Sequence, residues 1–115
     1  MQRGEIWLVD LEPVRGSKAD KSRPAIVVSN DGANARARAI GRGVISVVPV
    51  TSNVARALSF QVLLTPEESG LDRDSKAQAE QVRSLDVTRL TRRVGRVSPA
   101  RMWELDEALR RHLDL

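Results

Sequence analysis

The hydrophobic positions fall into short runs separated by polar stretches, and most of these runs are typical of β-strands. "GEIWLVDL" (4–11) ends just before Glu12-Pro13, and "RPAIVVSN" (23–30) is almost continuously apolar after its proline. "VISVVPV" (44–50) has the same buried character, whereas "LSFQVLL" (58–64) alternates as a half-buried strand does. "RRVGRV" (92–97) predicts one more strand, with Gly95 at a place where another backbone approaches closely.

The stretches between these runs predict loops, and the last stretch of the chain predicts a helix. Residues 14–22 and 31–43 are polar and lack periodicity, and 65–75 is typical of a turn region. Residues 76–87 ("KAQAEQVRSLDV") are ambiguous, because their composition favours a helix. Ser98 can cap the terminal helix and Pro99 suits its first turn. An apolar stripe at helical spacing follows, made of Met102, Leu105, Leu109 and Leu113.

Size and pattern together limit the architecture. A chain of 115 residues is expected to form a single domain over 1–115. Short strands with one terminal helix predict an α+β, mostly β fold, a compact antiparallel β-barrel or sheet with small helices. No apolar stretch approaches the roughly 20 residues that span a membrane. The sequence has no cysteine and no signal-peptide pattern at its start, so we expect a soluble, cytoplasmic protein that binds no membrane.

The charge balance indicates what the partner is made of. Sixteen of the nineteen basic residues are arginines, the formal net charge is +4, and the pI is about 10.6. Arginine binds phosphate through two hydrogen bonds at once, so an acidic polymer such as a nucleic acid is a natural partner. An arginine-rich proteome encoded by a GC-rich genome explains the same composition, and composition alone does not decide between the two.

Most kinds of catalytic site are absent from the sequence. His112 is the only histidine, so one chain cannot supply a histidine acid–base pair, and we expect this residue to pack or face solvent. The acidic pairs Glu67–Glu68 and Asp72–Asp74 are expected to solvate a loop rather than to bind an ion. Phosphate-binding glycine loops, nucleophile elbows and zinc-protease motifs do not occur. The aromatic residues are expected in the core: Trp7, Phe60 and Trp103.

What remains is arginine near hydroxyl and amide side chains at the ends of strands. This set suits the cleavage of RNA, because the substrate's own 2′-hydroxyl attacks the neighbouring phosphate and the protein needs neither a nucleophile nor a metal. A fixed guanidinium stabilises the charge that grows on the phosphate oxygens in the transition state. A threonine hydroxyl can donate a hydrogen bond to the same phosphate.

Four segments, in order, give the chain a resemblance to a known family. They are "RGEIWLVDLEPVRGSKADKSRPAIVVSND", "VISVVPVTSN", "LDRDSKAQAEQVRSLDVTRL" and "VGRVSPARMWELDEALRRHLDL", and together they extend over almost the whole chain. The chain resembles the MazF, PemK and Kid toxins, which are mRNA interferases of bacterial toxin–antitoxin pairs. The resemblance implies an SH3-like β-barrel that forms a homodimer. It also implies that residues 76–87 form a strand despite their helical composition.

The resemblance also implies which residues form the site. The family's catalytic arginine and threonine correspond to Arg23 and Thr51, with Ser17 and Gln81 as expected RNA contacts. Asn30 and Ser52 are weaker candidates of the same kind. Structural roles remain open: Thr51 can simply end a strand or cap a short helix at 52–57. Arg23 can instead pair with one of three carboxylates, those of Asp20, Asp31 and Glu80.

One departure from the family leaves the general base unassigned. Many relatives carry glutamate two residues after the loop glycine, where this chain has Lys18; Asp20 is nearby, but its role is speculative. The family implies sequence-specific cleavage of single-stranded RNA without metal or cofactor, giving 2′,3′-cyclic phosphate and 5′-hydroxyl ends and inhibiting translation and growth. It also implies an antitoxin partner with an acidic, largely disordered tail.

Two other functions fit the same fold. The first is a gyrase poison that resembles CcdB, which would leave RNA intact and stall gyrase. The second is a basic RNA-binding barrel, which would bind RNA with a steep salt dependence and never cleave it.

Overall fold

The computed structural model describes residues 1–11 and 22–115, and β-strands dominate it. The elements are β1 (Glu5–Asp10), β2 (Ser22–Val27), α1 (Asp31–Ile40), β3 (Val44–Thr51), β4 (Gln61–Leu64), α2 (Pro66–Ser69), β5 (Ser75–Gln78), β6 (Arg83–Asp86), β7 (Leu90–Arg96) and α3 (Pro99–Leu113). Two short 3₁₀ turns, η2 (Ala79–Gln81) and η3 (Val87–Arg89), flank β6.

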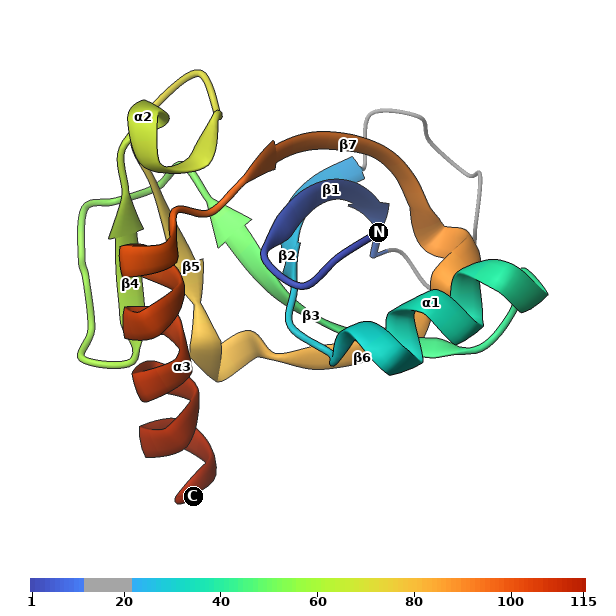
Figure 1. Cartoon of the computed structure of the whole chain (residues 1–115). Coiled ribbons are helices and arrows are strands. Elements are labelled where there is room, and N and C mark those ends of the chain that lie inside the picture. The colour runs from blue at the N-terminus through green and yellow to red at the C-terminus, as the bar shows by residue number, and fades with distance from the viewer. Residues whose placement is uncertain (12–21) are drawn as a thin grey trace.

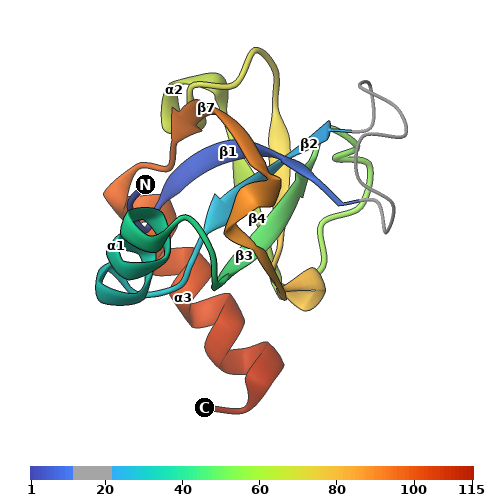
Figure 2. The ribbon, with the colours of Figure 1, turned by 90° about the vertical axis from the view of Figure 1, so that its right-hand side faces the viewer.

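All the strand pairs are antiparallel and belong to one strongly curved sheet (Figures 1 and 2). The strand order is β4-β5-β3-β2-β1-β7, and β6 also pairs with β3. This confirms the expected mostly β, barrel-like fold with a C-terminal helix. Within the described residues the terminal strands β4 and β7 do not pair with each other, so the sheet curves around its core without closing.

β3 is the central strand, because it pairs with β2 on one side and with both β5 and β6 on the other. Val47 lies opposite Arg83 in β6 and Val50 opposite Ala77 in β5, and η2 accommodates the extra residues between these two partners. The prediction of a strand over 76–87 is therefore confirmed, with η2 as an interruption. Pairing with β3 outweighs the helical propensity of this segment.

The prediction of a loop over 31–43 is wrong, because residues 31–40 form α1. Asn30 caps this helix: its side-chain oxygen accepts a hydrogen bond from the Ala33 N–H at 2.8 Å. Gly41 ends it in the left-handed conformation, with φ of 77°. Alanine at every second position from 33 to 39 favours the helix. The buried Asn34 anchors the helix, since its amide donates to the Ser29 carbonyl oxygen at 2.8 Å.

Two smaller corrections concern the segments around β4. The strand predicted over 58–64 begins only at Gln61, and the predicted turn region 65–75 contains the short helix α2. A capping box between Thr65 and Glu68 explains α2, because each side chain accepts from the other residue's backbone N–H. Gly70 then ends α2 in the left-handed conformation.

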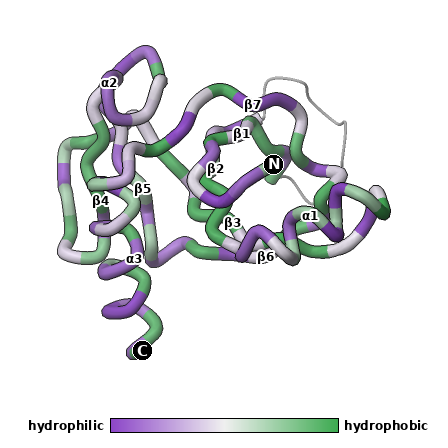
Figure 3. The backbone as a smooth tube through the Cα atoms, in the orientation of Figure 1, coloured by the Kyte–Doolittle hydropathy of each residue, from purple (hydrophilic) through white to green (hydrophobic). Residues whose placement is uncertain are grey.

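The terminal helix α3 confirms its prediction and covers one part of the core. The Ser98 side chain caps it by accepting from the Arg101 N–H. Leu105 and Leu109 of the expected stripe are buried, Met102 packs against the same cluster, and Leu113 at the end of the helix is 49% exposed. Figure 3 shows apolar residues concentrated along β3 and β4, while α3 alternates between apolar and polar positions.

The core consists of two clusters on either side of the curved sheet. The larger cluster includes Ile6, Ile26, Val48 and Leu64, and α3 packs against it. The second includes Val9, Ala25, Val47 and Leu85, together with Ala37 from α1. No helix in the described part of the chain is long and apolar enough to cross a lipid bilayer.

Candidate active site

Arg23 lies near the start of β2, where pairing with β1 and the following proline restrain the backbone. It is opposite Val9 of β1 in the ladder, and Pro24 restricts its backbone to extended conformations. Ala25, Ile26 and Val27, which follow in the strand, are fully buried. The Arg23 side chain is exposed, and its guanidinium donates to the Ser22 carbonyl oxygen at 3.2 Å. A fixed backbone therefore presents a charged group to solvent.

Thr51 is the last residue of β3, where the chain turns away from the sheet. Its hydroxyl oxygen accepts a hydrogen bond from the Asn53 N–H at 3.1 Å, which stabilises the turn. This bond uses an acceptor position only, so the hydroxyl hydrogen can still be donated to a ligand. The short helix that the sequence left open at 52–57 does not form. Thr51 thus ends a strand and keeps a hydroxyl donor.

A pocket of about 510 Å³ brings Arg23 and Thr51 together. Ser52, a weaker candidate from the sequence, also lines it. Leu11, Pro24, Pro49 and Val50 contribute apolar walls. The pocket lies where the end of β1, the start of β2 and the end of β3 meet, because antiparallel pairing places the start of one strand beside the end of the next.

Sequence reasoning did not place four polar residues that also line this pocket: Asp72, Arg73, Ser75 and Gln78. They reach it because β5 pairs with β3, which brings Lys76 opposite Thr51. The sequence feature that could have indicated these residues is the charged turn "LDRDS" (71–75), which leads into a strand. With Arg23 and Arg73 against the single carboxylate of Asp72, the described charged groups of the pocket carry a net positive charge.

The other predicted contact residues lie elsewhere. Gln81 is exposed on η2 and does not line the pocket, and Asn30 caps α1 at the opposite end of β2 from Arg23. Ser17, together with Lys18 and Asp20, lies outside the described residues. The assignments of all these residues to RNA stay predictions.

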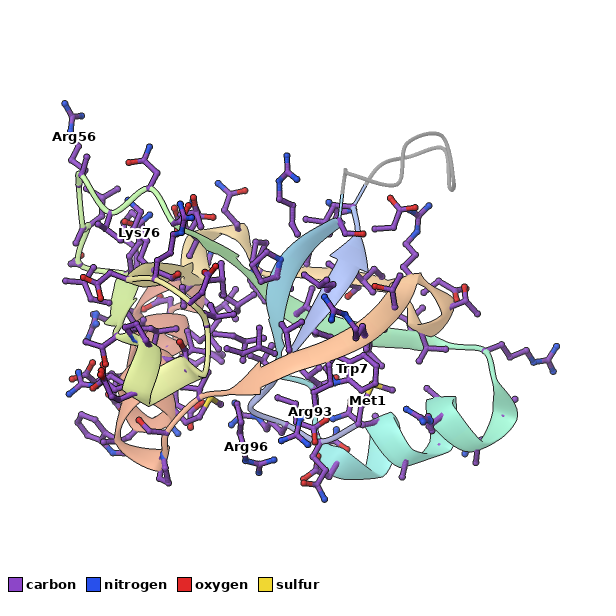
Figure 4. All side chains as sticks on the ribbon, turned by 90° about the horizontal axis from the view of Figure 1, so that it is seen from above. Met1, Trp7, Arg56, Lys76, Arg93 and Arg96 are labelled. Atoms are coloured by element: carbon purple, nitrogen blue, oxygen red, sulfur yellow. The ribbon has the colours of Figure 1, made fainter. Side chains whose placement is uncertain are left out.

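Lys76 is buried beside Thr51, which is unusual for a lysine. Its ammonium group donates to the Arg56 carbonyl oxygen, so it ties the segment 52–60 to β5. Figure 4 shows Arg56 at the outer end of that segment, with Lys76 between it and the sheet. Lys76 therefore stabilises the chain that leaves Thr51.

Glu5 is a second buried charge, on the opposite face of β1 from the larger core. Burial raises the pKa of this carboxyl group, but hydrogen bonds from the Trp7 indole and the Gln2 N–H and the nearby charge of Arg93 lower it more. The net pKa lies below the ordinary 4.5, so Glu5 is ionised at neutral pH. Arg96 also lies 3.7 Å from its carboxylate.

The remaining candidates for chemistry take structural or surface positions. His112 is exposed, and its ring lies 6.3 Å from that of Phe60, as expected for a packing or surface residue. Trp7 and Phe60 are half-buried, but Trp103 is 66% exposed on α3, so its prediction as a core residue is wrong. Position 103 faces away from the stripe that Leu105 and Leu109 bury. Over 1–11 and 22–115, no three His, Cys, Asp or Glu side chains gather as a metal site would require.

Comparison with known proteins identifies the family. Residues 2–113 match the family described as "PemK-like, MazF-like toxin of type II toxin-antitoxin system". Endoribonuclease MazF9 of Mycobacterium tuberculosis H37Rv is 63% identical over 115 residues, covering 100% of this chain and 98% of that protein. Endoribonuclease MazF6 of the same strain is 40% identical over 116 residues, with the same coverage of both chains.

A solved structure supports the same assignment at the level of the fold. An endoribonuclease in complex with its cognate antitoxin, from a mycobacterial species, superposes with a TM-score of 0.78 at 24% identity, covering 100% of this chain and 96% of that one. The profile match and the sequence relatives extend over nearly the whole chain, as the resemblance seen in the four sequence segments implied. The chain belongs to the PemK-like, MazF-like toxin family of type II toxin–antitoxin systems.

Proposed function

We propose that the chain is the toxin of a type II toxin–antitoxin pair and an endoribonuclease that cleaves single-stranded RNA at specific sequences, arresting translation and growth. The observation that carries the proposal is the pocket that joins Arg23 and Thr51, two residues from different strands. A guanidinium, a hydroxyl donor and a net positive charge on the described lining residues suit a phosphate whose negative charge increases during the reaction. The named activity of the 63% identical relative supports the same function.

The reaction that we propose uses the substrate's own nucleophile. The ribose 2′-oxygen forms a bond to the adjacent phosphorus, and the bond from phosphorus to the 5′-oxygen breaks. The products are a 2′,3′-cyclic phosphate and a 5′-hydroxyl, without metal or cofactor. Arg23 stabilises the phosphate oxygens, and Thr51 donates a hydrogen bond to one of them.

Two protons must move in this reaction, one from the 2′-hydroxyl and one to the leaving 5′-oxygen. We place Asp72 as the acceptor of the first, because it is the one carboxylate among the described residues that line the pocket, and solvent water donates the second to the leaving oxygen. The Arg73 guanidinium lies 3.7 Å from this carboxylate, and both side chains are exposed. Asp72→Asn should therefore lower kcat, whereas an unchanged kcat would exclude this role.

Cleavage of a defined RNA in EDTA tests the main proposal, with the ends of the products identified by mass. Arg23→Ala should lower kcat by at least about a hundredfold while the far-ultraviolet circular dichroism stays the same. Arg110→Ala is the matched control, because this exposed arginine lies on α3 and pairs with Glu107. Full activity of a folded Arg23→Ala variant, or fast cleavage of RNA that lacks every 2′-hydroxyl, would refute the mechanism. Intact RNA with stalled gyrase would instead support the gyrase poison.

The partners that we propose follow from the family and the charge. An antitoxin with an acidic, largely disordered tail can cover the basic pocket in the cytoplasm and fold on binding. We also propose that the toxin acts as a homodimer. Sedimentation of the free chain tests the dimer, and loss of RNA cleavage on adding the antitoxin tests the inhibition.

A further inference from the structure

A second cavity, of about 440 Å³, is lined by residues of α1, β1, η3 and β7. Its lining includes Met1, Trp7, Ala37, Arg38, Leu90 and Thr91, and it shares no described residue with the pocket of Arg23 and Thr51. The proposed cleavage reaction uses none of these side chains.

The indole of Trp7 is held in one orientation at this cavity. Its N–H donates to the Glu5 carboxylate at 3.0 Å, and the Gln2 backbone N–H donates to the same oxygen at 3.0 Å. Glu5 is buried, whereas Trp7 is only half-buried. An aromatic ring with a fixed orientation and accessible surface can bind a flat ligand without ordering itself first.

Arginines surround this ring. The Arg38 guanidinium lies 5.9 Å from the centre of the Trp7 ring, is exposed, and forms no ion pair with the described residues. Arg93 lies opposite Trp7 in the β1–β7 ladder. Arg93 and Arg96 both lie 3.7 Å from the single Glu5 carboxylate and are about half exposed. Figure 4 shows Trp7, Met1, Arg93 and Arg96 on one part of the molecule. The surface therefore combines an aromatic face with excess positive charge.

This combination fits a nucleotide of single-stranded RNA. A base of any identity can stack on an aromatic ring and gain affinity from the contact, and arginine binds the phosphate. We propose that the cavity is a second RNA-binding site, which holds an unpaired nucleotide of the substrate strand outside the cleaved step. This inference rests on the proposed function, because it takes the ligand to be the same RNA that is cleaved.

The position along β1 allows one strand of RNA to reach both sites. Trp7 lines the second cavity and Leu11 lines the first, and the two are four residues apart, or about 13 Å along an extended backbone. Trp7 and Leu11 are partly exposed and Val9 between them is fully buried, so a strand that joins the two sites passes over the surface and not along this packed face. The short separation lets an RNA strand held by the first pocket continue over the surface to Trp7.

Tryptophan fluorescence tests the proposal directly, because the chain has only two tryptophans. In a Trp103→Phe background, Trp7 is the only source of the signal, and 2′-deoxy oligonucleotides of increasing length cannot be cleaved. We expect quenching on binding, and a Kd that falls once the oligonucleotide is long enough to reach from the first pocket to Trp7. Arg38→Ala should lose about tenfold in affinity for the longer probes. Arg36→Ala is the matched control, being exposed on the same helix but not lining the cavity.

Several results would overturn the inference. One is Trp7 fluorescence that does not change when anisotropy, measured in parallel, shows that binding is saturated. Others are a Kd that does not depend on oligonucleotide length, and equal losses of affinity for Arg36→Ala and Arg38→Ala. Tighter binding of a free mononucleotide or of an acidic peptide would also overturn it. Thermal unfolding of each variant separates a loss of binding from a loss of fold. Quenching that depends on Arg38 without any RNA cleavage would refute the proposed function alone. Cleavage without a Trp7 response would refute this inference alone.

Discussion

Gly95 is the position at which one added methyl group should damage the fold most. A Cβ on Gly95 would lie 2.1 Å from the Ser69 carbonyl oxygen, and real Cβ atoms essentially never come within 3.0 Å of another heavy atom. The two backbones would therefore have to separate by about 1 Å, and neither can do so easily. Gly95 pairs with Ile6 in the β1–β7 ladder, and Ser69 is buried, with its hydroxyl bonded to the Thr65 carbonyl oxygen at 3.0 Å.

We therefore expect Gly95→Ala to lower the free energy of unfolding by about 3 kcal/mol, at the upper end for an overpacked site. For a chain of this size, that corresponds to a fall in Tm of about 10 °C or more. Urea denaturation followed by circular dichroism gives the free energy, and an unchanged m-value shows that the unfolded state is the same.

Gly41→Ala is the control, because Gly41 is favoured by its backbone conformation and not by the close approach of another backbone. Its φ is +77° and no atom lies within 4 Å of the added Cβ, so only backbone strain of about 1 kcal/mol is expected. A Gly95→Ala variant as stable as the wild type, or more stable than Gly41→Ala, would refute the argument from close approach.

Three further results are expected. Lys76→Met should speed tryptic cleavage after Arg56 about tenfold, because the ammonium that binds the carbonyl of that peptide bond is lost; an unchanged rate would show that the segment does not depend on Lys76. Ser98→Ala should lower the free energy of unfolding by about 1 kcal/mol through loss of the helix cap, as urea denaturation can measure. The lowered pKa of Glu5 means that its contribution to stability is complete above about pH 4.5 and is lost as the pH falls through the folded pKa. Tm should therefore fall below that pH, and Glu5→Gln should flatten the fall; equal slopes would contradict the assignment.

Segments with a local signal were predictable from the sequence. The apolar runs gave β1, β2 and β3, and Ser98-Pro99 marked the start of α3. Close backbone approach at Gly95 was also expected, and it is confirmed, because a Cβ added there would lie only 2.1 Å from the Ser69 carbonyl oxygen. In each case neighbouring residues determine the conformation, so one sequence is sufficient.

The errors occurred where the deciding interaction was not an apolar pattern. α1 buries only Asn34 and Ala37, so it lacks the stripe by which an amphipathic helix is recognised. Its cap at Asn30 and its alternating alanines were the available signals. Conversely, residues 76–87 have a helical composition, but their partner β3 is distant in sequence, and only the family resemblance indicated a strand.

The candidate site also combines residues that the sequence could indicate with residues that only the strand pairing brings together. Arg23 and Thr51 were placed by resemblance, and the structure puts both on one pocket. Asp72 and Gln78 were not placed, because their nearness to Thr51 depends on the pairing of β5 with β3. No spacing within the sequence encodes such a contact.

That the pocket is assembled from three separate segments has a consequence during protein synthesis. Its walls come from residues near 23, 50 and 72–78, so a nascent chain lacks the complete cleft until most of it has left the ribosome. The pairings concerned are long-range and form late in folding. We expect that the growing polypeptide cannot cut its own message, and that toxicity begins only after release of the finished molecule.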